Sequence, residues 1–166
     1  MNLSDIHLLI DYNYWATARV LAAAEQVTPQ QYTAPAGLSH GSLRGALVHI
    51  LGAEVVWRSR WQEGISPNGL LAEGDFPGLA ELHARWTAEE ERMRSYIASL
   101  SDAALNAPLR YTTTKGLPTE NVLWQLIVHL VNHGTQFRAE AAVALSALGH
   151  SPGDLDLLLY LRLHAE

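Results

Sequence analysis

Apolar residues recur every three or four positions in four long segments of the chain, which is the spacing of one face of an α-helix. The segments run from about Ser4 to Gln26, from Ser42 to Glu63, from Leu79 to Leu100, and from just after Thr119 to Leu148. Amphipathic helices of this length with shorter connections predict an all-α four-helix bundle with short additional helical segments. We expect it to form a single domain over residues 1–166.

Residues typical of helix ends mark several of these boundaries. Ser4 and Thr119 are of the types that cap helix N-termini, and Gly64 is a typical C-terminal stop. Thr28 followed by Pro29 predicts the start of a further short helical turn.

The connections are predicted to be mostly irregular. Gly64–Phe76 contains three glycines and Pro67-Asn68, and predicts a loop. Leu109–Thr114 has strand propensity and precedes Lys115-Gly116, so it predicts a short hairpin or an extended loop. The tail from Asp154 to Leu163 is expected to form a short closing helix.

Composition and charge exclude several functional classes. The net charge is −6 with 11 basic residues and no basic run, so nucleic acid is not expected as a partner. The absence of cysteine excludes disulfides, thiolate metal ligands and a cysteine nucleophile. The N-terminal segment lacks the pattern of a signal peptide, and no apolar stretch has the length of a membrane span. We therefore expect a cytoplasmic protein that does not associate with membranes.

Three histidines in the apolar helical segments are the strongest indication of chemistry. His129 and His133 are four positions apart, so both imidazoles project from one face of the fourth predicted helix. His49 lies in the second predicted helix, and bundles build metal sites from side chains on facing helices. Imidazole binds divalent ions such as zinc and nickel, and three protein ligands with an open position are typical of a catalytic metal. The pattern therefore predicts a metal site formed by His49, His129 and His133.

A core without metal is the alternative interpretation of these histidines. Hydrogen bonds to the backbone or between imidazoles can satisfy buried rings, so this interpretation stays open. Among the other histidines, His7 and His40 are near enough in the pattern to support a ligand. The rest are expected at the surface.

Two polar residues share the histidine face of the fourth helix. Gln136 lies three residues beyond His133, and Glu140 lies seven residues beyond it. Either can hold a water or orient an imidazole, so these two are the predicted catalytic residues. The alternative for Glu140 is an ion pair with Arg138, Arg162 or another surface charge.

Two glycines flank the histidine of the second helix. Gly45 and Gly52 lie on either side of His49, where their missing side chains allow close approach of another helix or leave room for substrate. Trp57 and Trp61 are expected in the core and at its rim.

Motifs spread over most of the chain occur together in one known family. They are Tyr12-Asn13-Tyr14-Trp15-Ala16, Ser39-His40-Gly41-Ser42-Leu43, Leu47-Val48-His49-Ile50, His129-Leu130-Val131-Asn132-His133 and Gly149-His150-Ser151-Pro152. In their order and spacing the chain resembles the DinB/YfiT-like superfamily, whose members are described as metal-dependent hydrolases.

This resemblance implies a four-helix bundle that binds a divalent metal, often nickel or zinc, through one histidine of the second helix and an HxxxH pair. The matching residues here are His49, His129 and His133, and all three are present. The resemblance also implies frequent homodimers. The reactions of the family include hydrolysis and the transfer of low-molecular-weight thiols such as bacillithiol or mycothiol.

We therefore expect a metal-dependent enzyme that acts on a small molecule, either as a hydrolase or as a low-molecular-weight-thiol transferase. The class that stays open beside it is a non-catalytic metal-binding or stress-response interaction protein. An open metal position that faces a cavity of small-molecule size favours the enzyme. A metal closed off by a fourth protein ligand favours a structural role.

A homodimer is expected as well, because apolar residues lie on more than one face of two predicted helices and one core need not cover them all. These residues are Leu9, Ile10, Val20 and Leu21 on the first helix and Val143, Leu145 and Leu148 on the fourth. The alternative is that Leu155–Leu163 folds back over this surface within one chain.

Overall fold

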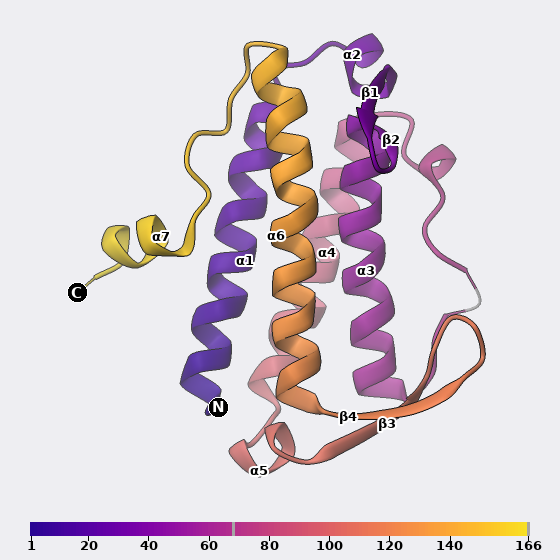
Figure 1. The fold of residues 1–166 in the computed structure, drawn as a ribbon, viewed down its shortest axis with the longest axis vertical. Helices are drawn as coiled ribbons and strands as arrows, with labels where there is room; N and C mark the ends of the chain where they lie inside the picture. Colours follow the sequence, from indigo (N-terminus) through magenta and orange to yellow (C-terminus); the bar gives the residue numbers. More distant parts are fainter. Residues whose placement is uncertain (68, 166) are drawn as a thin grey trace.

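Four long helices pack side by side in the computed structural model, which describes residues 1–67 and 69–165 (Figure 1). They are α1 (Leu3–Ala24), α3 (Leu43–Glu63), α4 (Leu79–Ala98) and α6 (Leu123–Ala147). The predicted all-α four-helix bundle is confirmed. α6 packs against both α1 and α3, and α4 lies behind them. Asn68 of the predicted loop and Glu166 at the end of the predicted domain lie outside the described residues.

Short elements connect the four helices at both ends of the bundle. They are α2 (Pro29–Thr33), β1 (Pro35–Leu38), β2 (Gly41–Ser42), the 3₁₀ turn η1 (Glu73–Asp75), α5 (Asp102–Leu105), β3 (Pro108–Thr112), β4 (Pro118–Val122) and α7 (Leu157–Leu163). β1 pairs with β2 and β3 pairs with β4, both antiparallel. The predicted hairpin and closing helix are therefore confirmed, whereas the β1–β2 hairpin had not been predicted.

Local capping explains where the helices end. Gly64 ends α3 in the left-handed conformation with φ 72°, and Thr28 caps α2, both as predicted. The Ser4 prediction is wrong, because Asn2 caps α1 in a reciprocal pair with Asp5.

The start of α6 also differs from the prediction. Thr119 is not an N-cap but a residue of β4, where it pairs with Tyr111 of β3. The backbone of Pro118–Val122 pairs with β3, so these residues are extended and α6 begins only at Leu123.

The core consists of apolar side chains from all four long helices. Its most deeply buried members include Ile6, Ala16, Leu47, Leu51, Leu82, Met93, Ile97, Ile127 and Leu145. The C-terminal segment packs on α1, where the Tyr12 hydroxyl donates to the Leu155 carbonyl at 2.9 Å and the rings of Trp15 and Tyr160 lie 5.5 Å apart.

This packing corrects the sequence argument for an uncovered apolar face. Ile10, Val20, Leu21 and Leu145 are all buried within the chain. Val143 remains on the surface, with 68% of its area exposed.

A polar network lies among the apolar side chains at the centre of the bundle. Glu54 of α3 accepts hydrogen bonds from Asn13 Nδ2 at 3.0 Å, from the Tyr14 hydroxyl at 3.3 Å and from Trp86 Nε1 at 3.1 Å. Arg138 of α6 in turn donates to Asn13. The network links all four long helices and therefore helps to set their relative positions.

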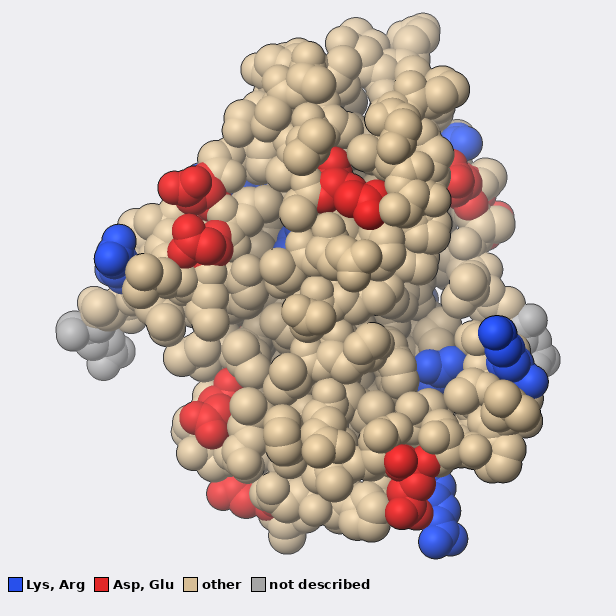
Figure 2. All heavy atoms as spheres, viewed as in Figure 1, with Lys and Arg blue, Asp and Glu red and all other residues tan. Residues whose placement is uncertain are grey.

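Charged side chains are sparse on the face shown in Figure 2, where acidic and basic residues form small separate groups. No continuous basic area is visible on that face. Among the described residues, none of the helices combines the length and hydrophobicity needed to cross a lipid bilayer.

Candidate metal centre

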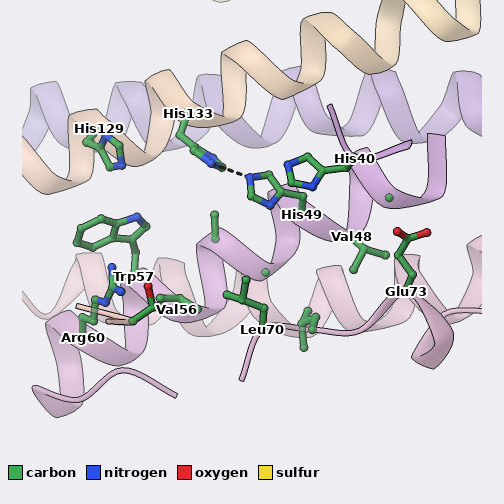
Figure 3. A pocket seen from close by; sticks show the side chains of 15 residues that line it. His40, Val48, His49, Val56, Trp57, Arg60, Leu70, Glu73, His129 and His133 are labelled. Atoms are coloured by element: carbon green, nitrogen blue, oxygen red, sulfur yellow. Dashed lines mark hydrogen bonds between the residues drawn. The ribbon is translucent and has the colours of Figure 1, made fainter. Parts of the chain in front are cut away.

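His49 of α3 and His133 of α6 meet between the two helices (Figure 3). Their Nε2 atoms lie 3.0 Å apart, so one ring donates a hydrogen bond to the other. Two imidazole nitrogens bound to one tetrahedral zinc ion at ordinary bond lengths lie about 3.3 Å apart. The spacing of this pair is therefore close to that of two ligands of one metal ion.

Burial keeps both rings neutral. It lowers the pKa of His49 to about 4, with a further contribution from His40, and lowers that of His133 to about 4, with contributions from His49 and His129. The neutral imidazole is the form that binds metal ions. Among the described residues, the buried Nδ1 of His133 has no hydrogen-bond partner.

His129 lies one turn before His133 and faces the same cavity. Its ring centre is 6.1 Å from that of His133, and its ring packs edge-on against Trp57 at 5.3 Å. Within residues 1–67 and 69–165, no three histidine, aspartate or glutamate side chains are arranged to hold a metal ion. The structure thus brings two of the predicted ligands into contact and places the third on the same cavity wall.

The cavity beside these histidines has a volume of about 530 Å³, within the usual range for small-molecule sites. Apolar side chains form much of its wall: Val48, Val56, Trp57, Leu70 and Leu71. Gly52 also lines it, and a Cβ added there would have Leu71 at 3.9 Å as its nearest neighbour. Gly52 therefore leaves space in the cavity. This agrees with the interpretation that its missing side chain leaves room for substrate.

His40 reaches the cavity from the turn between β1 and β2. Its ring stacks on that of His49 with centres 3.7 Å apart, and Phe137 packs edge-on against both rings. Gly45 makes this approach possible, because an added Cβ would lie only 2.0 Å from the His40 carbonyl oxygen. Of the two histidines expected near the ligands, His40 is there, while His7 is exposed on α1.

The two predicted catalytic residues lie elsewhere. Gln136 and Glu140 line a separate hollow together with Ser39, and neither lines the histidine cavity. Glu140 accepts hydrogen bonds from the Ser39 hydroxyl at 2.7 Å and the Ser39 amide at 2.9 Å, which lower the pKa of its carboxyl. Its described partner is thus Ser39, next to His40, rather than Arg138 or Arg162.

Among the described residues, the carboxylate that lines the histidine cavity is that of Glu73. It accepts from Arg44 Nε at 3.2 Å and from the Ser42 hydroxyl at 3.4 Å, which ties it to the start of α3. Glu73 was not singled out from the sequence, because it lies in a segment that predicts a loop.

Arg60 was missed for a different reason. It lines the cavity from α3, eleven residues after His49, and Ala53 and Val56 lie between them on the same face. The spacing of four, three and four residues is helical, so a search along the His49 stripe would have found it.

Comparison with known proteins gives one family result. The model of the DinB family matches residues 1–166, the whole chain. No curated protein matches the chain.

Proposed function

The chain belongs to the DinB family, and we propose that it is a metal-dependent enzyme in which His49, His129 and His133 bind a divalent ion, nickel or zinc. The observation that carries the proposal is the approach of His49 Nε2 to His133 Nε2 at 3.0 Å on the wall of a cavity of about 530 Å³. The neutral state of both rings and the general metal association of the family support the same assignment. When bound, such an ion polarises a substrate oxygen or favours deprotonation of a water or thiol.

The chain's own residues hold the ligands and shape the substrate site. His40 stacks on one face of the His49 ring and Phe137 packs edge-on against it, so the two contacts restrict rotation of the ring. Glu140 holds the turn that carries His40 through its two hydrogen bonds to Ser39. The apolar wall of Val56, Trp57 and its neighbours orients an apolar substrate and limits access of water.

Of the two reaction types, thiol transfer requires fewer catalytic groups from the residues that line this cavity. Hydrolysis needs a group that takes a proton from water, and the carboxylate that lines the cavity, Glu73, is already held by Arg44. An external thiol brings its own nucleophile, and it loses its proton far more readily than water does. We therefore propose low-molecular-weight-thiol transfer first and hydrolysis second.

Metal content tests the site. Purified wild-type protein is compared with the H49A/H129A/H133A triple variant and with H83A, which removes an exposed histidine of α4. We expect about one ion per chain in the wild type and in H83A and little in the triple variant. Equal metal content in all three proteins would contradict the proposal.

Activity of the metal-loaded protein tests the reaction type. Panels of esters, amides and electrophiles are assayed with and without a low-molecular-weight thiol. Turnover that requires the thiol supports transfer, and turnover without it supports hydrolysis.

A non-catalytic binding protein is the second candidate, and one contact favours it. The hydrogen bond between His49 and His133 satisfies both Nε2 atoms without any metal. A non-catalytic protein with a structural metal site predicts metal in the wild type without turnover in the panels. One with a vestigial site predicts equally little metal in the wild type and the triple variant, again without turnover.

A further inference from the structure

Arg60 is a buried cation at the cavity wall. Only 6% of its surface is exposed, and burial lowers the pKa of its guanidinium. Nε donates to the Ser66 hydroxyl at 2.8 Å, and the guanidinium carbon lies 4.5 Å from the ring centre of Trp57 and 5.4 Å from that of Tyr111. Burying a cation is costly unless an anion or several acceptors compensate it.

Within the described residues, no carboxylate forms an ion pair with Arg60, in contrast to other arginines of α3. Arg58 is paired with Glu89, and Arg44 is paired with Glu73. The aromatic faces of Trp57 and Tyr111 compensate part of the charge of Arg60. They do not accept hydrogen bonds from the N–H groups in the plane of its guanidinium. The guanidinium thus retains hydrogen-bond donors for which the described residues offer no acceptor besides the Ser66 hydroxyl.

The position of Arg60 relative to the histidines is suited to a substrate. Figure 3 shows Trp57 between Arg60 and His129, and the Trp57 ring is in contact with both. Because Arg60 and all three predicted metal ligands line the same cavity, one molecule can reach both.

We propose that Arg60 binds an anionic group of the substrate, a carboxylate or a phosphate, and that the substrate joins this group to an apolar body. Guanidinium matches both oxyanions with paired hydrogen bonds, and the apolar wall beside it takes the body of the molecule. The inference rests on the proposed function for one assumption, that the cavity receives a substrate. It adds the class of that substrate and the residue that selects it.

Binding of small probes to the metal-free protein tests this selection. The probes are phenylacetate and phenyl phosphate as anions, and phenylacetamide as the neutral counterpart of phenylacetate. A chelator removes metal first, because a bound ion would itself attract an anion. Affinities are measured by ligand-observed NMR titration at low ionic strength, where charge interactions are least screened.

We expect the wild type to bind phenylacetate about tenfold more tightly than phenylacetamide, the size of effect typical of one hydrogen-bonded charge. R60Q is expected to lose this preference while its affinity for phenylacetamide stays unchanged. R60K, which keeps the charge but loses the planar pair of donors, is expected to lie between them. R110Q, which removes the same charge from the exposed Arg110 of β3, is the matched control and is expected to behave as the wild type. The stronger of the two anionic probes identifies the head group.

The inference is overturned if the wild type binds neither phenylacetate nor phenyl phosphate more tightly than phenylacetamide, or if a folded R60Q keeps the preference for the anion. A second measurement needs no variant. Phenylglyoxal modifies arginines, and phenylacetate is expected to slow modification of Arg60 but not of Arg110, as read by peptide mass spectrometry. Equal rates at Arg60 with and without phenylacetate also overturn it.

These results are distinguishable from failure of the proposed function. Anion selection is measured without metal, whereas the metal assignment is tested by metal content. R60Q is expected to contain as much metal as the wild type. If the protein prefers anions but binds no metal, the Arg60 inference holds and the metal site is contradicted. If it binds metal but shows no anion preference, the metal site holds and the Arg60 inference is contradicted.

Discussion

The guanidinium of Arg138 on α6 donates a hydrogen bond through Nη1 to the side-chain oxygen of Asn13 on α1. The Asn13 amide donates onward to Glu54 on α3, and each of these three residues is only 1% exposed. α3 carries His49 and α6 carries His133, so the buried network connects the two helices whose separation determines the candidate metal centre. Breaking such a network leaves buried polar groups unpaired, which costs more than the hydrogen bonds themselves contribute.

Gly134→Ala tests how much the buried network contributes to the stability of the protein. A Cβ added at Gly134 would lie 2.6 Å from Arg138 Nη1 and 2.9 Å from Asn13 Oδ1, so both groups must move apart. We expect the free energy of unfolding, measured in urea, to fall by about 1–3 kcal/mol. Gly52→Ala is the matched control on α3, because its nearest neighbour is at 3.9 Å. A gain of about 0.5–1 kcal/mol is expected there from helix propensity, and equal gains in both variants would contradict the role of the network.

Glu54 makes the stability of the protein depend on pH. Burial raises the pKa of the Glu54 carboxyl from its ordinary value of 4.5 to about 7, against the opposing effects of Asn13, Arg138 and Trp86. Between these two values the folded state binds more protons than the unfolded state, so this contribution to stability is present below pH 4.5 and is lost as pH rises through 7. The slope is at most about 1.4 kcal/mol per pH unit.

Glu54→Gln removes this titration. The difference in free energy of unfolding between wild type and E54Q is expected to shift against the wild type as pH rises from 4.5 to 7 and then to level off. Denaturant unfolding at several pH values measures it. A difference that does not change with pH would show that Glu54 does not titrate in this range.

Two substitutions at Glu140 separate positioning from proton transfer. Glu140→Gln keeps an oxygen that accepts from the Ser39 amide, and its NH2 group can donate to the Ser39 hydroxyl oxygen, so the turn and His40 stay in place. Glu140→Ala removes both hydrogen bonds. If Glu140 acts by holding the turn, E140Q retains near-wild-type metal affinity and activity, and E140A loses about tenfold, as is typical of residues that support ligands. Loss of activity in E140Q with unchanged metal affinity would instead assign Glu140 as the base.

We predict a homodimer, although fewer apolar residues are exposed than the sequence pattern suggested. The basis is the family resemblance, which implies frequent homodimers, together with exposed apolar side chains such as Val143 on α6, 68% exposed, and Leu158 on α7, 55% exposed. Light scattering at micromolar concentration is expected to give twice the chain mass of 18.2 kDa. Val143→Lys is expected to weaken the dimer, while Leu117→Lys on the β3–β4 turn, 61% exposed, serves as control. A mass near 18.2 kDa at every concentration contradicts the prediction.

The sequence by itself determined the features that depend on near neighbours along the chain. Helical periodicity located α1, α3, α4 and α6, and Gly64 marked the end of α3 because its left-handed conformation is a local property. Local rules also predicted the β3–β4 hairpin. They misplaced the start of α6, because the pairing of Thr119 with Tyr111 competes with helix capping and depends on a second strand.

Only the tertiary structure decided which distant residues meet. His49 and His133 are 84 positions apart, and their contact depends on the packing of α3 against α6, which periodicity alone leaves open. The same packing turned the Tyr12–Ala16 motif into a buried link to Glu54, through Asn13 and Tyr14. It also placed Glu140 against Ser39, away from the histidine cavity, and left Arg60 at the cavity wall with no carboxylate beside it among the described residues. Charge compensation depends on distances between side chains in space, and the order of residues in the chain does not contain those distances.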